Sequence, residues 1–149
     1  INDGGILAIL AVIVLVAWSR YRKVGLTAFG SLGVEFIIVN LLLKPNVERT
    51  RPFIVLDQLQ LLGSTPTDFS FPSGHTGSAF AVATVMLLCM PAKYGVTAVV
   101  VSTLIAFSRL YNAAHYPTDV LTGMVIGILT GVIASCIYKK YSKKHDLGE

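Results

Sequence analysis

Three short polar clusters interrupt an otherwise apolar chain: Lys44 to Arg51-Pro52, Pro72-Ser73-Gly74-His75, and Ser108-Arg109 with His115 and Asp119. Among their residues are two histidines, three cations and a carboxylate, although only 13% of the chain is charged. Guanidinium and ammonium groups hold phosphate, and a histidine beside a carboxylate is a common nucleophile or base. The clusters therefore contain the groups needed to bind a phosphate and to break its ester bond.

The elements that must carry these clusters are strongly apolar. The chain has 149 residues, which is one domain by length, and it is 54% hydrophobic with a mean hydropathy of +0.70. A soluble protein of this size could not bury so much apolar surface, and polar groups at the ends of lipid-length apolar runs are costly to keep without a function. We therefore expect residues 1–149 to form a single integral-membrane domain.

Five apolar stretches alternate with charged turns: Gly4 to Trp18, Val24 to Leu43, His75 to Met90, Tyr94 to Leu110, and Pro117 to Tyr138. Each is near the roughly 20 residues that a helix needs to cross the hydrocarbon, or a few short of it. Buried helices of a soluble core are the alternative, but these runs lack the polar faces that such helices need. The predicted fold is all-α, a polytopic transmembrane bundle with five visible spans. Because the chain opens with Ile1 rather than Met, a further span is expected before it.

The distribution of positive charge predicts the orientation. Eight of the twelve cations fall in three places that this topology puts on one side of the membrane: Arg20, Arg22, Lys23, Lys93, Lys139, Lys140, Lys143 and Lys144. By the positive-inside pattern these places, including a tail at about 139–149, are cytoplasmic. An external loop at about 44–72 and the loop 111–116 then lie outside, together with all three clusters. The orientation of the chain in the bilayer thus accounts for the net charge of +4. The bilayer is the expected partner, and no nucleic-acid partner is expected.

Two further segments leave alternatives open. Phe53 to Leu62 has the helical spacing of apolar residues and could lie on the bilayer surface, or it could be a plain loop over the bundle. The last span carries Gly123, Gly127 and Gly131 on one helical face, where small residues let helices approach closely in lipid. Packing within the chain is the favoured role of this face, and a homodimer through it is the alternative.

The second cluster predicts a helix start. Ser73 is a candidate N-cap, Gly74 lets backbone approach a ligand, and His75 stands at the entrance of the helix. Helix N-termini attract phosphate through their free amides. An ordinary capped helix whose histidine meets water is the competing interpretation.

The third cluster predicts an oriented histidine. His115 and Asp119 are four residues apart, and Pro117 between them favours the first turn of the last helix. One turn brings both side chains within hydrogen-bond reach, so that Asp119 can orient His115 and stabilise its positive form. Lys44, Arg51 and Arg109 supply the cations that would stabilise the charge of a phosphoryl group.

Together the clusters resemble the pattern of the type 2 phosphatidic acid phosphatase (PAP2) superfamily of lipid phosphatases. That pattern is Lys, six residues, Arg-Pro; then Pro-Ser-Gly-His; then Ser-Arg, five residues, His, three residues, Asp, and all of it is present here in order. The resemblance implies hydrolysis of a lipid phosphate through a phosphohistidine, without metal or other cofactor. It implies His115 as nucleophile, Asp119 as its orienting acid and His75 as proton donor to the leaving group. The residues implied to bind phosphate are Lys44, Arg51, Ser73, Gly74 and Arg109.

The family's membrane members usually have six spans, which fits a first span before Ile1. The small size and short loops resemble the bacterial phosphatidylglycerophosphate and undecaprenyl diphosphate phosphatases more than the larger eukaryotic enzymes. A non-catalytic binder or transporter of lipid phosphate is the rival from another class, and a hydrolase with metal held by His75, His115 and Asp119 is a second. Glu35 and Arg49 lie outside the pattern and are not expected to be catalytic.

Overall fold

The computed structural model describes the chain except residues 1–3, 57, 59–60, 62–64 and 147–149. Its described part is helical, without strands. The elements in chain order are α1 (Gly4–Ala17), a 3-10 turn (Ser19–Tyr21), α2 (Arg22–Phe36), a π-helical stretch (Ile37–Leu43), α3 (Lys44–Val47), α4 (Pro52–Val55), α5 (Gly74–Cys89), α6 (Ala92–Tyr111) and α7 (Pro117–Asp146). The five predicted apolar stretches coincide with helices to within one residue at their ends, so the all-α fold is confirmed.

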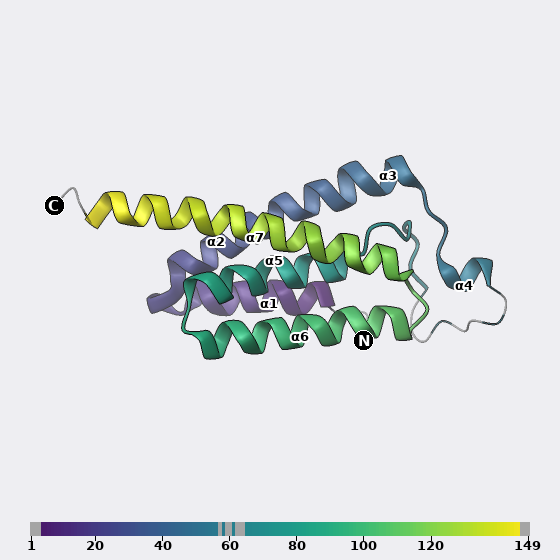
Figure 1. Ribbon diagram of the computed structural model, residues 1–149, viewed down its shortest axis with the longest axis horizontal. Coiled ribbons are helices and arrows are strands. Elements are labelled where there is room, and N and C mark those ends of the chain that lie inside the picture. The colour runs from purple at the N-terminus through teal and green to yellow at the C-terminus, as the bar shows by residue number, and fades with distance from the viewer. Residues whose placement is uncertain (1–3, 57, 59–60, 62–64, 147–149) are drawn as a thin grey trace.

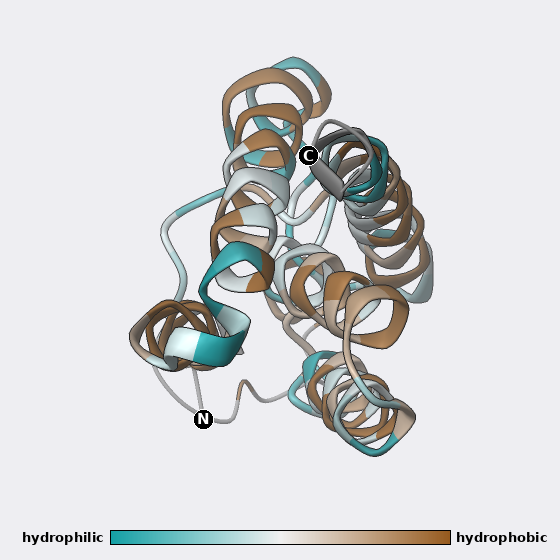
Figure 2. Ribbon diagram, turned by 90° about the vertical axis from the view of Figure 1, so that its left-hand side faces the viewer, coloured by the Kyte–Doolittle hydropathy of each residue, from teal (hydrophilic) through white to brown (hydrophobic). Residues whose placement is uncertain are grey.

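Within the described residues, three helical segments are long and apolar enough to cross a membrane, namely Ser19–Val55, Ala92–Tyr111 and Pro117–Lys143. The segments Gly5–Ala17 and Gly74–Cys89 are apolar but shorter. The outward faces of the bundle remain apolar, since Phe29, Leu104 and Phe107 expose 64%, 64% and 65% of their surface. Brown, apolar residues accordingly recur along the long helices in Figure 2. Such a surface is suited to lipid.

Helix α5 lies at the centre of the bundle and packs against α1, α2, α6 and α7 (Figure 1). Nearly every residue of its middle is buried, and the side chains there are mostly small, as in Ala79, Ala81 and Ala83. Small side chains allow close approach of helix backbones where lipid gives no hydrophobic drive for association. Helix α5 is thus surrounded by the other core helices, and its first turn carries His75.

The glycine face of α7 packs against α5 of the same chain. A Cβ on Gly127 would lie 2.9 Å from the backbone nitrogen of Ala81, and a Cβ on Gly131 would lie 2.9 Å from the Ala81 carbonyl oxygen. A Cβ on Gly123 would come closer than 3.0 Å to the carbonyl oxygen of Ser73. Packing within the chain is therefore the role of this face. Because α5 covers the glycines within the chain, they favour this packing, and the alternative, a homodimer through this face, stays a prediction.

The segment after α4 does not continue as the helix considered for Phe53 to Leu62. Helix α4 ends at Val55, and Leu56 is extended, with φ −114° and ψ 97°. Gln58 and Leu61 are not helical either, while residues 57, 59–60 and 62 lie outside the described part. Pro52 at the start of α4 fixes the first turn, but only four residues follow the helical path.

Candidate active site

The three polar clusters meet at one end of the bundle, at the right of Figure 1. Lys44 stands where the long α2 segment runs into α3, and Arg51 immediately precedes α4. His75 lies in the first turn of α5 and Arg109 in the last turn of α6. His115 precedes α7, whose first turn carries Asp119. Residues far apart in the sequence are therefore brought together by helix ends.

Five of the eight predicted site residues line one cavity of about 140 Å³: Lys44, Arg51, His75, Arg109 and His115. Pro66, Asp68 and Ala114 complete its wall. The cations Lys44, Arg51 and Arg109 are only 7%, 4% and 3% exposed. Buried cations need an anion, so a cavity lined by three of them is suited to a phosphate.

The imidazole of His115 is held in one tautomer. Its Nδ1 lies 2.7 Å from the carbonyl oxygen of Ser70, which can only accept a hydrogen bond, so Nδ1 carries the proton. Its Nε2 lies 3.3 Å from Nη1 of Arg51, a donor, and therefore presents its lone pair. Burial lowers the pKa of His115 below 6.5, although Asp119 opposes this effect. The ring is thus neutral, with a nucleophilic nitrogen at the cavity.

Asp119 is placed behind His115 rather than in direct hydrogen bond with it. The distance from Asp119 Oδ2 to His115 Nδ1 is 3.7 Å, longer than the bond to Ser70. Asp119, the expected orienting acid, is therefore next to the ring, but the hydrogen bond from Nδ1–H of His115 is accepted by the Ser70 carbonyl oxygen. Asp119 is fully buried, and its proximity would stabilise a positive charge that developed on the neutral ring.

The hydrogen bonds of Asp119 include two residues that the sequence reasoning missed, Arg49 and Ser70. Oδ1 accepts a hydrogen bond from Arg49 Nη1 at 2.7 Å, and Oδ2 accepts from Ser70 Oγ at 2.5 Å and from the backbone N–H of Tyr116 at 2.9 Å. Arg49 also donates to Thr118 Oγ1 at 2.6 Å and stacks on the Tyr116 ring. One signal could have pointed to Arg49: the Asp119 carboxylate at the membrane edge needs a cation, and a neutral His115 does not supply one.

Ser73 and Gly74 do not line the cavity. Ser73 occupies the N-cap position of α5, but its hydroxyl lies 3.0 Å from that of Thr76 and makes no capping bond. Its backbone N–H donates instead to the Asp119 carbonyl oxygen at 3.0 Å, which ties the start of α5 to α7. Gly74 lines a neighbouring groove. Phosphate binding by these two residues stays a prediction.

Asp68 is a third residue that was missed, and it contacts two of the predicted cations. Its carboxylate pairs with Lys44 Nζ through Oδ2 and with Arg51 Nη2 through Oδ1, the latter at 2.6 Å. Burial alone would raise the pKa of Asp68, but its bonds to Lys44 and Arg51 lower it overall. Asp68 is therefore an ionised carboxylate at the edge of the cavity.

The described residues offer no cluster of three His, Cys, Asp or Glu side chains that could hold a metal ion. In particular, His75, His115 and Asp119 do not form the ligand set considered from the sequence. Glu35, which was not expected to be catalytic, is fully buried and accepts a hydrogen bond from Ser78 Oγ at 2.9 Å. This contact joins α2 to α5, as a packing role requires.

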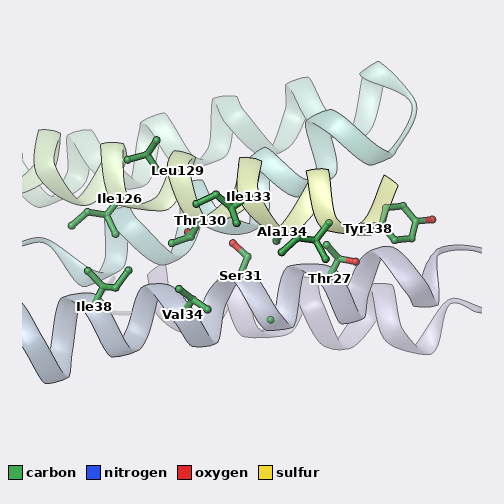
Figure 3. Close-up of a pocket in the computed structure, with 12 residues that line it drawn as sticks. Thr27, Ser31, Val34, Ile38, Ile126, Leu129, Thr130, Ile133, Ala134 and Tyr138 are labelled. Atoms are coloured by element: carbon green, nitrogen blue, oxygen red, sulfur yellow. The ribbon is translucent and has the colours of Figure 1, made fainter. Parts of the chain in front are cut away.

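An apolar groove of about 500 Å³ adjoins the site. Its walls include Ile9 of α1 and Phe29, Leu32 and Phe36 of α2, and it shares Lys44, Asp68 and His75 with the site. A second apolar cavity, of about 540 Å³, lies between α2 and α7 (Figure 3). None of the predicted site residues lines this second cavity. The candidate active site is therefore the polar cavity at the end of the first groove.

The fold and the site define a helical membrane protein with a cationic cavity beside a neutral histidine. The chain belongs to the PAP2 superfamily, whose pattern matches residues 24–143. The match includes all three clusters. Together with the membrane-type helices, it makes the chain a multi-pass membrane protein of this superfamily.

Three comparisons illustrate the relationship. The chain is similar to an undecaprenyl-diphosphatase of Sulfolobus acidocaldarius, with 32% identity over 113 residues, but it spans only 54% of that protein's length and 76% of its own. The fold is similar to Aquifex aeolicus LpxE, with a TM-score of 0.74 and 26% identity over 89% of this chain and 81% of that one. It is also similar to a transmembrane PAP2-type phosphatidylglycerolphosphate phosphatase from Bacillus subtilis, with a TM-score of 0.68, 26% identity, and coverage of 90% and 68%.

Proposed function

We propose that the protein is an integral-membrane lipid phosphate phosphatase that works through a phosphohistidine and without a metal ion. The observation that carries the proposal is the single cavity lined by His115, His75 and three buried cations. A site that only bound phosphate would need the cations but not a neutral histidine with its lone pair toward them. The comparisons add that similar proteins are named as lipid phosphatases.

The geometry around His115 supports the following reaction. Nε2 attacks the terminal phosphorus as its bond to the leaving oxygen breaks, and His75 donates a proton to that oxygen. The leaving oxygen is the ester oxygen in phosphatidylglycerophosphate and the bridging anhydride oxygen in undecaprenyl diphosphate. Arg51, Arg109 and Lys44 stabilise the negative charge on the phosphoryl oxygens. The imidazole becomes positive when it is phosphorylated, and the buried Asp119 carboxylate stabilises that charge. Water, deprotonated by His75, then attacks the phosphohistidine and releases inorganic phosphate.

The apolar groove between α1 and α2 supports a lipid as substrate. It leads to Lys44 and His75 at one end, while its walls are aromatic and aliphatic side chains. A lipid chain could lie along these walls with its phosphate in the cavity, as pockets with apolar walls and a few polar groups bind their ligands. Phosphatidylglycerophosphate and undecaprenyl diphosphate are the favoured substrates. The site faces the external side, with the C-terminal tail in the cytoplasm.

Phosphate release from purified phosphatidylglycerophosphate, phosphatidic acid and undecaprenyl diphosphate tests the function. The chain is expected to hydrolyse at least one of them, with activity unchanged by EDTA and inhibited by vanadate, which imitates five-coordinate phosphorus. A phosphoprotein that is stable to alkali and labile to acid should form in the wild type and be absent from His115→Asn. Binding of these lipids without turnover would instead identify a lipid-phosphate binder or transporter, and turnover that required zinc would identify a metal enzyme.

A further inference from the structure

The hydrogen bonds of Arg51 leave no donor for a phosphate. A guanidinium has five N–H groups. Nε donates to the Asp68 carbonyl oxygen at 2.9 Å, and Nη1 faces the Ala114 carbonyl oxygen at 2.8 Å and His115 Nε2 at 3.3 Å. Nη2 faces the Asp68 carboxylate at 2.6 Å and the Phe69 carbonyl oxygen at 3.4 Å. A phosphate oxygen can bind Arg51 only by replacing one of these partners.

Asp68 is the partner that can be replaced at least cost. Three of the other acceptors are backbone carbonyls fixed by the chain, and the fourth is the nucleophilic nitrogen itself. The Asp68 side chain is 52% exposed, so its charge can turn into water. The same carboxylate is bound to Lys44, so its departure frees both cations at once.

The buried cations also explain why a carboxylate returns. The side chains of Lys44 and Arg51 are 9% and 5% exposed, and departing phosphate would leave both without a counter-charge. An unpaired buried charge is strongly unfavourable. A tethered carboxylate that takes the place of phosphate removes this barrier to product release.

Building on the proposed phosphatase activity, we infer that Asp68 is an intramolecular competitor of phosphate that must leave Lys44 and Arg51 for substrate to bind and that replaces the product when it departs. The site then binds every phosphate, substrate and product alike, more weakly than its cations alone would. Asp68 does not touch the reacting atoms, so it is a positioning residue that adjusts affinity and release.

Titration of the purified protein with inorganic phosphate tests this role without any turnover. Asp68→Asn keeps the side-chain size and removes the charge, and it is expected to bind phosphate about tenfold more tightly, because the half-exposed Asp68 carboxylate no longer competes for Lys44 and Arg51. Asp68→Glu, which keeps the charge, should bind close to wild type. Glu48→Gln removes an exposed acid from the same external segment and is the matched control, with affinity expected within about twofold of wild type.

Steady-state kinetics test the same role independently. In Asp68→Asn the KM should fall, product inhibition by phosphate should strengthen, and kcat should not rise. If Asp68 were only a strut for Lys44 and Arg51, its loss would weaken phosphate binding and raise KM, which would overturn the inference, as would an equal gain in Glu48→Gln. Asp68→Ser serves as a second neutral variant if the asparagine protein does not fold. A wild type that binds phosphate but hydrolyses no lipid would refute the function and leave this titration valid.

Discussion

Gly127 offers a sharp test of how α5 and α7 pack. A Cβ at this position would lie 2.9 Å from the Ala81 nitrogen, 3.1 Å from the Gly77 carbonyl carbon and closer still to the Gly77 carbonyl oxygen. All three are backbone atoms of α5, which cannot rotate away as a side chain would. The Gly127→Ala variant must therefore move the two helices apart by roughly 1 Å.

The size of the effect follows from two opposing contributions. Overpacking of a tight interface costs about 1–3 kcal/mol, and a backbone clash belongs at the upper end of that range. Alanine in a helix gains about 1 kcal/mol over glycine. The Gly127→Ala variant should thus lose about 2 kcal/mol of stability.

Gly30→Ala is the matched control, because a Cβ at Gly30 of α2 would meet nothing within 4 Å. It should keep the helical gain of about 1 kcal/mol, so the two variants should differ by about 3 kcal/mol. Both are measured by reversible unfolding in detergent micelles and by phosphate release. If Gly127→Ala proved as stable as Gly30→Ala, the close approach of α5 and α7 described above would be refuted.

Three other outcomes concern the site. Asp119→Asn, which removes the charge beside His115, should lower kcat by about 10³-fold while helical content by circular dichroism is kept; a near-normal rate would contradict the stabilising role of Asp119. Arg49→Gln should lower kcat by about ten- to a hundredfold with little change in KM, because Arg49 bonds Asp119 and not the cavity; a raised KM alone would place Arg49 on the substrate instead. Since burial lowers the pKa of His115, its nucleophilic form persists into more acidic solution, and the acid limb of kcat/KM should fall below pH 6.5; a limb above that value would be inconsistent with this environment.

The helices could be predicted because their signals are local. Apolar runs of membrane length, the proline before Asp119 and the glycine spacing of α7 each specify a helix, its start or its contact face. The conformation of the segment around Leu56 could not be predicted, because apolar spacing there is equally compatible with a helix and with a loop packed over the bundle. The extended conformation of Leu56 ends the helix after four residues.

The chemistry of the site was only partly predictable for a different reason. Sequence spacing identifies His115 and Asp119 as neighbours, but it does not show that the Ser70 carbonyl accepts the imidazole proton at 2.7 Å. Any residue can offer a backbone carbonyl, so its identity carries no signal. Asp68 and Arg49 were missed because their partners, Arg51 and Asp119, lie 17 and 70 residues away along the chain.

The packing of α5 on α7 and the assembly of the site depend on the same contact. The Ser73 backbone N–H donates to the Asp119 carbonyl oxygen at 3.0 Å, and a side chain at Gly123 would strike the Ser73 carbonyl. The glycines therefore set the distance between the helix that carries His75 and the helix that carries Asp119. Because the two side chains that we propose to act in catalysis must stay in register within a few tenths of an ångström, the glycine face belongs to the proposed catalytic apparatus even though no described glycine of α7 lines the cavity.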